Sequence, residues 1–135
     1  MREKELILQK SSLISQDMVD ALSGLFGDKN PIHLEDSYAR KKGFERPIVH
    51  GAILNAIVSN LVGNDFPGHG SVILNSSAKY VKPVFVKDLL KLNAYVLYHS
   101  KALSVYDMRI DIMVERPKYG LHKVAVFDVR VMCKS

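Results

Sequence analysis

The segment from Gly51 to Leu61 constrains the fold most, because it predicts a helix that is apolar on almost every side. Its apolar residues point in nearly all directions when placed on a helix: Ala52, Ile53, Ala56, Ile57, Val58 and Leu61. Such a helix has to be covered on most of its sides by the rest of the chain. Turn-forming residues follow it and are expected to end it: Gly63, Pro67, Gly68 and Gly70.

The residues that follow this helix predict a sheet. Four apolar or alternating segments read as strands, at 72–81, 90–98, 106–112 and 125–131. The connections between the last three are short, with residues 118–120 as one turn. We therefore expect these three strands to form an antiparallel meander.

Two shorter elements are expected before the apolar helix. Residues 6–8 form a strand candidate, and Ser15 can cap a helix whose first turn carries Asp17 and Asp20. Apolar side chains at helical spacing give that helix one buried face: Met18, Val19, Leu22 and Leu25. Together these patterns predict one α+β domain over residues 1–135, in which an antiparallel sheet wraps around a mostly buried helix.

Composition narrows the class of protein. No apolar run reaches the roughly 18 to 20 residues that a membrane helix needs. Cys133 is the only cysteine, so we expect no internal disulfide, an inert thiol and a cytoplasmic location. The net charge of +5 suits an anionic partner. No nucleic-acid motif accompanies this charge, whereas the phosphates of coenzyme A or an acidic carrier protein would match it equally well.

The most informative polar residues are Asp28 and His33, which are separated by the turn-forming pair Asn30-Pro31. A bend there could turn the carboxylate and the imidazole toward one small volume, where they could hold a water and move protons. An Asp-x-Asn-Pro segment taken alone is more often only a turn, with its polar side chains bonded to local backbone.

A second group lies where residues 47–51 lead into the apolar helix. Gly51 would present its backbone N–H without a Cβ, and unpaired N–H groups at a helix start attract developing negative charge. That arrangement can form an oxyanion site, although a glycine there is also a common cap. A metal site built from Asp28, His33, Glu35 and Asp36 offers one histidine and hard carboxylates, so we expect no metal and no cofactor.

The chain contains, in this order, Gly27-Asp28-x-Asn30-Pro31-Ile32-His33, then Ala39, then Phe44-x-x-Pro47-Ile48-Val49-His50-Gly51. This combination resembles the MaoC-like, or (R)-specific enoyl-CoA hydratase, family. The likeness continues through Tyr80 and the segment 83–88. The resemblance implies a hotdog fold, usually homodimeric, and addition of water to a trans-2-enoyl thioester of coenzyme A or of an acyl carrier protein. It makes the chain a hydro-lyase that forms, or dehydrates, an (R)-3-hydroxyacyl thioester.

Carried over by position, the resemblance makes Asp28 and His33 the catalytic pair and the Gly51 N–H the oxyanion donor. Asn30 and His50 join the substrate-binding group, with His50 shaping the start of the helix. Ser59 matches a position that lines the acyl pocket in relatives; it could equally bond the carbonyl of the preceding turn.

One residue departs from the family pattern. Phe26 stands where a small hydroxyl residue is common, and it should join the core or narrow the pocket.

Two other functions compete with hydration. A hotdog thioesterase would use Asp28 to activate water against the thioester, and release of free thiol would reveal it. A non-catalytic module that binds acyl carriers should have lost Asp28 or His33, and both are present.

Overall fold

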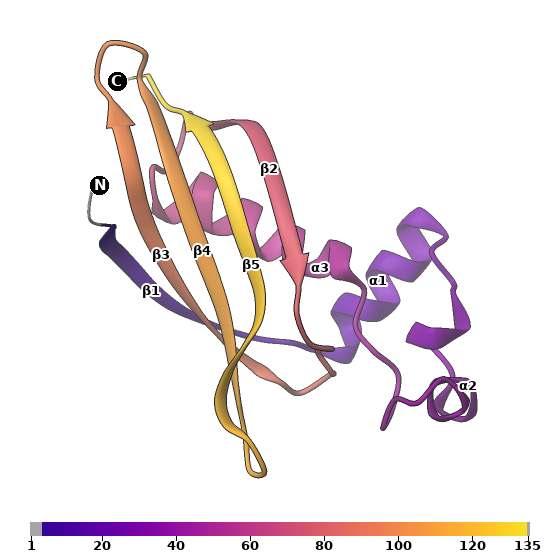
Figure 1. The fold of residues 1–135 in the computed structure, drawn as a ribbon. Helices are drawn as coiled ribbons and strands as arrows, with labels where there is room; N and C mark the ends of the chain where they lie inside the picture. The colour runs from indigo at the N-terminus through magenta and orange to yellow at the C-terminus, as the bar shows by residue number, and fades with distance from the viewer. Residues whose placement is uncertain (1–3, 135) are drawn as a thin grey trace.

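The structure is a computed structural model that describes residues 4–134, so residues 1–3 and 135 of the predicted domain lie outside the described part. Five strands form one antiparallel sheet in the order β1-β3-β4-β5-β2 (Figure 1). The strands are β1 (Glu5–Leu13), β2 (Val72–Tyr80), β3 (Leu89–Ser100), β4 (Val105–Arg116) and β5 (Gly120–Met132). The predicted meander of the last three strands is confirmed.

The apolar helix α3 (Gly51–Asn60) lies against one face of this sheet (Figure 1). Ile53, Leu54 and Val58 are its buried side chains, and they join one core cluster with the inward residues of β3, β4 and β5. Phe127 and Ile110 are fully buried in that cluster. The predicted arrangement, a sheet around a central helix, is therefore confirmed, and the helix continues as one wider turn (Leu61–Asp65) before it ends at Phe66.

The coverage predicted for α3 is only partly right. Ala52 and Ala56 are exposed and Ile57 is half-buried. The sheet covers one side of the helix, and α1 (Gln16–Phe26) contacts only a short part of another. Within residues 4–134, one flank of α3 therefore has no covering layer, although its sequence is apolar enough to accept one.

Helix α1 begins as predicted, because the Ser15 side chain accepts a hydrogen bond from the Met18 N–H at 3.3 Å. Its predicted buried face is only partly right. Val19 is buried and Leu22 packs against the core, but Leu25 is 79% exposed and Met18 is 36% exposed. The covered side of α1 is formed by Val19, Leu22 and Ser23, and the rest of the helix surface is exposed.

The chain between α1 and α3 contains two short helices that periodicity did not reveal. They are a single turn of 3₁₀ helix (Pro31–His33) and α2 (Asp36–Lys41), and both are too short to show an apolar repeat. Two backbone hydrogen bonds fix the approach to α3, from Ile48 N–H to the Ile32 carbonyl (3.1 Å) and from Val49 N–H to the Val84 carbonyl (2.7 Å).

The connection between β2 and β3 holds Val84 in place through a buried ion pair. Asp88 accepts a hydrogen bond from the Phe85 N–H (2.8 Å) and pairs with Arg116 (2.6 Å). The same guanidinium donates to the Pro83 carbonyl at 2.9 Å. The 83–88 segment is thus a rigid support for the residues that precede α3.

Among the described residues, no helix combines the length and the apolar character that spanning a bilayer requires.

Two leucines, Leu92 within β3 and Leu103 in the turn between β3 and β4, test the location of the core. Leu92→Ala removes a side chain that is 1% exposed and should lower the free energy of unfolding by about 2–5 kcal/mol, through lost burial and the cavity it leaves. Leu103→Ala changes a side chain that is 69% exposed and should shift stability by no more than about 0.5 kcal/mol. Chemical denaturation measures both, and equal losses would contradict the assigned core.

Candidate active site

The structure brings Asp28, His33 and His50 together from three different places in the chain. One carboxylate oxygen and one nitrogen from each ring all lie within 4.8 Å of one another. The two imidazole rings stack, with centroids 3.9 Å apart and planes inclined by 25°. Asp28 follows α1, His33 ends the 3₁₀ turn and His50 precedes α3, so the site depends on the loop between the two helices.

A backbone carbonyl sets the proton position on His33. Its Nδ1 lies 2.7 Å from the Ile48 carbonyl oxygen, which can only accept, so Nδ1 carries the hydrogen. In the neutral ring this leaves Nε2 as an acceptor on the side away from Ile48. His33 is partly buried, whereas Asp28 is exposed. The pair therefore offers two proton acceptors at the border between protein and solvent.

His50 fixes the backbone of Asp28. Its Nε2 lies 3.0 Å from the Asp28 carbonyl oxygen and therefore donates to it, with the Ser23 hydroxyl at 3.5 Å. The ring is 2% exposed, and Nδ1 has no hydrogen-bond partner in the described part of the chain. With His33 stacked on its face, His50 holds both members of the predicted pair beside the first residue of α3.

Gly51 occupies the N-terminus of α3, where the first N–H groups have no acceptor within the helix. A Cβ added here would lie 3.1 Å from two ring carbons of Tyr80. The Tyr80 hydroxyl accepts a hydrogen bond from the Asn55 amide (2.7 Å), and both side chains reach toward the Gly51 carbonyl at 3.4 Å. Asn55 was missed by sequence reasoning, since an amide inside a helix carries no motif.

A cavity of about 460 Å³ opens beside these residues, a size that suits a small ligand. His33 and Gly51 lie on its wall together with apolar side chains and Lys82. Its lining is His33, Phe44, Ile48, Val49, Gly51, Leu54, Tyr80, Val81, Lys82, Pro83 and Val84. The predicted acid–base residue His33 and the predicted oxyanion donor Gly51 therefore face one volume.

The other predicted residues do not line this cavity. Asp28 and His50 lie next to His33. The Asn30 side-chain oxygen accepts from the Ile32 N–H (3.2 Å), so it caps its own turn. Ser59 is exposed on α3 about 12 Å along the axis from Gly51. Within residues 4–134 its side chain forms no hydrogen bond to the preceding turn, and it does not line the cavity beside Gly51, so its role at the acyl chain stays a prediction. Phe26 is 78% exposed, so it neither joins the core nor narrows the cavity beside His33; it lines a different pocket.

The three clustered side chains are poorly arranged to share a cation. The lone pairs of an imidazole lie in the ring plane, and the rings of His33 and His50 are nearly parallel. Nitrogens on stacked rings direct their lone pairs side by side, whereas a zinc ion needs ligands that converge tetrahedrally. Glu35 and Asp36 do not belong to the cluster.

Comparison with known proteins gives a consistent picture. The sequence profile of the MaoC like domain matches residues 2–105. The chain is 46% identical over 94 residues to the (R)-specific enoyl-CoA hydratase of Aeromonas caviae, which covers 68% of this chain and 70% of that enzyme. It is 29% identical over 82 residues to a mitochondrial 3-hydroxyacyl-[acyl-carrier-protein] dehydratase of Arabidopsis thaliana, covering 61% of this chain and 48% of that protein.

The fold agrees with these sequence matches. The solved structure of an (R)-hydratase from A. caviae superposes with a TM-score of 0.83 and 28% identity, covering 98% of this chain and 96% of that one. The five-stranded sheet with its central helix is therefore the predicted hotdog fold.

Two glycines test whether Tyr80 closes over the start of α3. Gly51→Ala should lower the free energy of unfolding by about 1–3 kcal/mol, because the new methyl group overpacks against the Tyr80 ring. Gly63→Ala meets no atom within 4 Å and should be neutral or stabilising by up to about 1 kcal/mol. Thermal and chemical unfolding distinguish them; a neutral Gly51→Ala would show that the ring does not contact Gly51.

Proposed function

This chain belongs to the MaoC-like domain family, and from that membership we propose that it is a hydro-lyase that adds water to trans-2-enoyl-CoA. The product would be the (R)-3-hydroxyacyl-CoA, and the reverse dehydration would use the same site. One observation carries the proposal: Asp28 and His33 lie together beside a helix N-terminus that opens into a cavity, in a chain 46% identical to an (R)-specific enoyl-CoA hydratase.

In this proposal one water donates its two O–H groups to the Asp28 carboxylate and to Nε2 of His33. We assign the base to Asp28, which takes a proton as the water oxygen bonds to C3. The electron pair of the C2=C3 bond then moves toward the thioester oxygen. A proton returned by the same pair of residues completes the C2–H bond, so the enzyme regains its starting state.

The negative charge that develops on the thioester oxygen would be stabilised by the Gly51 N–H. The N-terminal end of α3 adds its positive dipole there, and the donor is already oriented before the reaction begins. Losing one such donor costs about 2.7–4 kcal/mol of transition-state stabilisation in other enzymes. The polar wall of the cavity is thus used for the thioester, and its apolar wall for the acyl chain.

The assembly we propose is a homodimer paired through β2. This edge strand hydrogen-bonds only to β5, and Val72, Ile73 and Leu74 are exposed on it. An exposed apolar edge is a site for pairing with another strand. Antiparallel pairing of two β2 strands would continue the sheet and bring a partner toward the uncovered flank of α3, where Ser59 lies.

The group that carries the acyl chain and the cellular location of the protein are also proposals. Lys82 on the cavity wall and the net charge of +5 would attract the phosphates of coenzyme A or an acidic acyl carrier protein. We propose a single domain over residues 1–135, acting in the cytoplasm on coenzyme A thioesters, with carrier-protein thioesters as the alternative to be compared.

The catalytic pair is tested by Asp28→Asn and His33→Ala. Each should lower kcat for hydration of crotonyl-CoA at least ~10²-fold while leaving the unfolding midpoint close to wild type. Asp17→Asn, in the exposed first turn of α1, and His69→Ala, in an exposed turn, are matched controls that should keep full activity. Near-normal rates in both site variants would disprove the assignment, and thiol release from saturated butyryl-CoA without hydration would identify a thioesterase.

His50 is proposed as a positioning residue, tested by comparing His50→Gln with His50→Ala. The alanine variant loses the hydrogen bond to the Asp28 carbonyl, so kcat should fall about 10-fold or more while KM changes little, because the cavity wall is intact. Glutamine keeps an N–H donor and should recover part of kcat. The control is the pH profile, which should keep its shape in both variants; a shifted profile would instead mean that His50 titrates in the reaction.

A further inference from the structure

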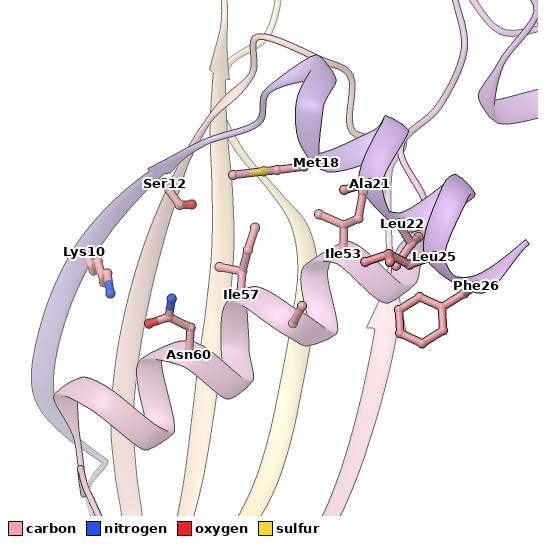
Figure 2. Close-up of a pocket in the computed structure, with 11 residues that line it drawn as sticks. Lys10, Ser12, Met18, Ala21, Leu22, Leu25, Phe26, Ile53, Ile57 and Asn60 are labelled. Atoms are coloured by element: carbon pink, nitrogen blue, oxygen red, sulfur yellow. The ribbon is translucent and has the colours of Figure 1, made fainter. Parts of the chain in front are cut away.

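A second cavity lies on a different side of α3, between that helix, α1 and β1 (Figure 2). Its volume is about 350 Å³. Ile53 and Ile57 line it, whereas Gly51 and Leu54 line the cavity of the candidate active site. The two cavities share none of their lining residues, so the second one is not a continuation of the first.

The polarity of this second cavity is strongly segregated. Met18, Ala21, Leu22, Leu25, Phe26, Ile53, Ala56 and Ile57 form its apolar part, and Lys10, Ser12 and Asn60 lie together at the other end (Figure 2). This explains two departures from the predicted fold. Leu25 and Phe26 remain exposed because they form the apolar mouth of a cavity rather than part of the core.

The polar end presents hydrogen-bond donors. The Asn60 oxygen already accepts from the Asn64 amide (3.0 Å), which leaves the Asn60 NH₂ group for a ligand. The Ser12 hydroxyl can donate beside it. Lys10 lies at the same end and pairs with Asp65 at 2.6 Å, with its side chain 35% exposed, so its ammonium retains further donor positions. A head group that only accepts hydrogen bonds and carries negative charge fits this end.

The size of the cavity favours a small molecule. Its volume is at the lower end of the range for ligand pockets, and it is hollow, whereas a protein interface would need a larger surface. From Ile53 to Asn60 the cavity follows α3 for about 10 Å. A narrow apolar trough of that length, with donors at one end, matches a single unbranched hydrocarbon chain that ends in an acceptor.

We infer that this cavity binds a straight-chain fatty acid as its carboxylate, with the head group at Lys10, Ser12 and Asn60 and the tail along Ile57 and Ile53 toward Phe26. This site is separate from the proposed hydration chemistry and does not depend on it. Its tail end contacts the last turn of α1, two residues before Asp28, so the bound chain would lie next to the loop that carries the catalytic pair.

The test is a titration of the full chain with sodium decanoate, hexanoate and decanol, followed by methyl NMR. Decanoate should shift the methyl signals of Met18 and Ile57 saturably and leave those of Leu54 unchanged. It should bind at least about tenfold more tightly than hexanoate, because each additional buried methylene contributes about fourfold. Decanol, which lacks the carboxylate, should bind at least about tenfold more weakly than decanoate.

Two tryptophan variants provide the matched comparison. Ala21→Trp fills the trough from an exposed position on α1 and should weaken decanoate binding at least about tenfold without changing hydration of crotonyl-CoA. Ala102→Trp, in the exposed turn between β3 and β4, should bind decanoate as wild type does. The inference is overturned if wild type shows no saturable shift, if only Leu54 responds, if decanol binds as well as decanoate, or if Ala21→Trp retains full affinity.

Discussion

The contact between His50 and the 27–33 loop is the interaction on which the candidate site depends. One buried ring donates a hydrogen bond to the Asp28 carbonyl and stacks on His33, and the next residue begins α3. A loop joining two helices would otherwise be free to separate the carboxylate from the imidazole. Because His50 is buried, the packing of the domain sets the position of the Asp28 backbone and of the His33 ring.

The sheet determines where the helix N-terminus lies. Val49 is bonded to Val84, and the 83–88 segment is held by the buried pair of Asp88 and Arg116. Tyr80, the last residue of β2, then packs over Gly51, so that a Cβ at Gly51 would lie 3.1 Å from its ring and the ring would have to shift. A glycine at this position therefore leaves room for the Tyr80 ring, and it leaves the proposed oxyanion donor without a Cβ beside it.

Much of the fold could be predicted because its signals are local and periodic. The strands of the meander and the capped start of α1 follow from alternation and from Ser15. The burial of α1 and α3 could not be predicted in the same way. Apolar residues such as Leu25 and Ala56 show that a surface can be covered, but only the structure shows that here they border a cavity. Short helices such as α2 escape periodicity altogether.

The candidate site likewise has some features that the sequence predicts and others that only the structure reveals. Asp28, His33 and Gly51 stand out because their residue types and spacing suit one reaction. The structure places His33 and Gly51 on the wall of one cavity, with Asp28 close to His33. The contribution of His50 could not be read from its motif, since it depends on a ring stacking across the loop. Ser59 remains a prediction, because it lies on the flank of α3 that no described residue covers.

The most direct test is a crystal structure of the Asp28→Asn variant with crotonyl-CoA bound, in which slow turnover should preserve the substrate. The account predicts the thioester oxygen about 2.7–3.1 Å from the Gly51 nitrogen and one water between residue 28 and Nε2 of His33, facing C3. A thioester bound elsewhere, or a reacting double bond out of reach of that water, would contradict it.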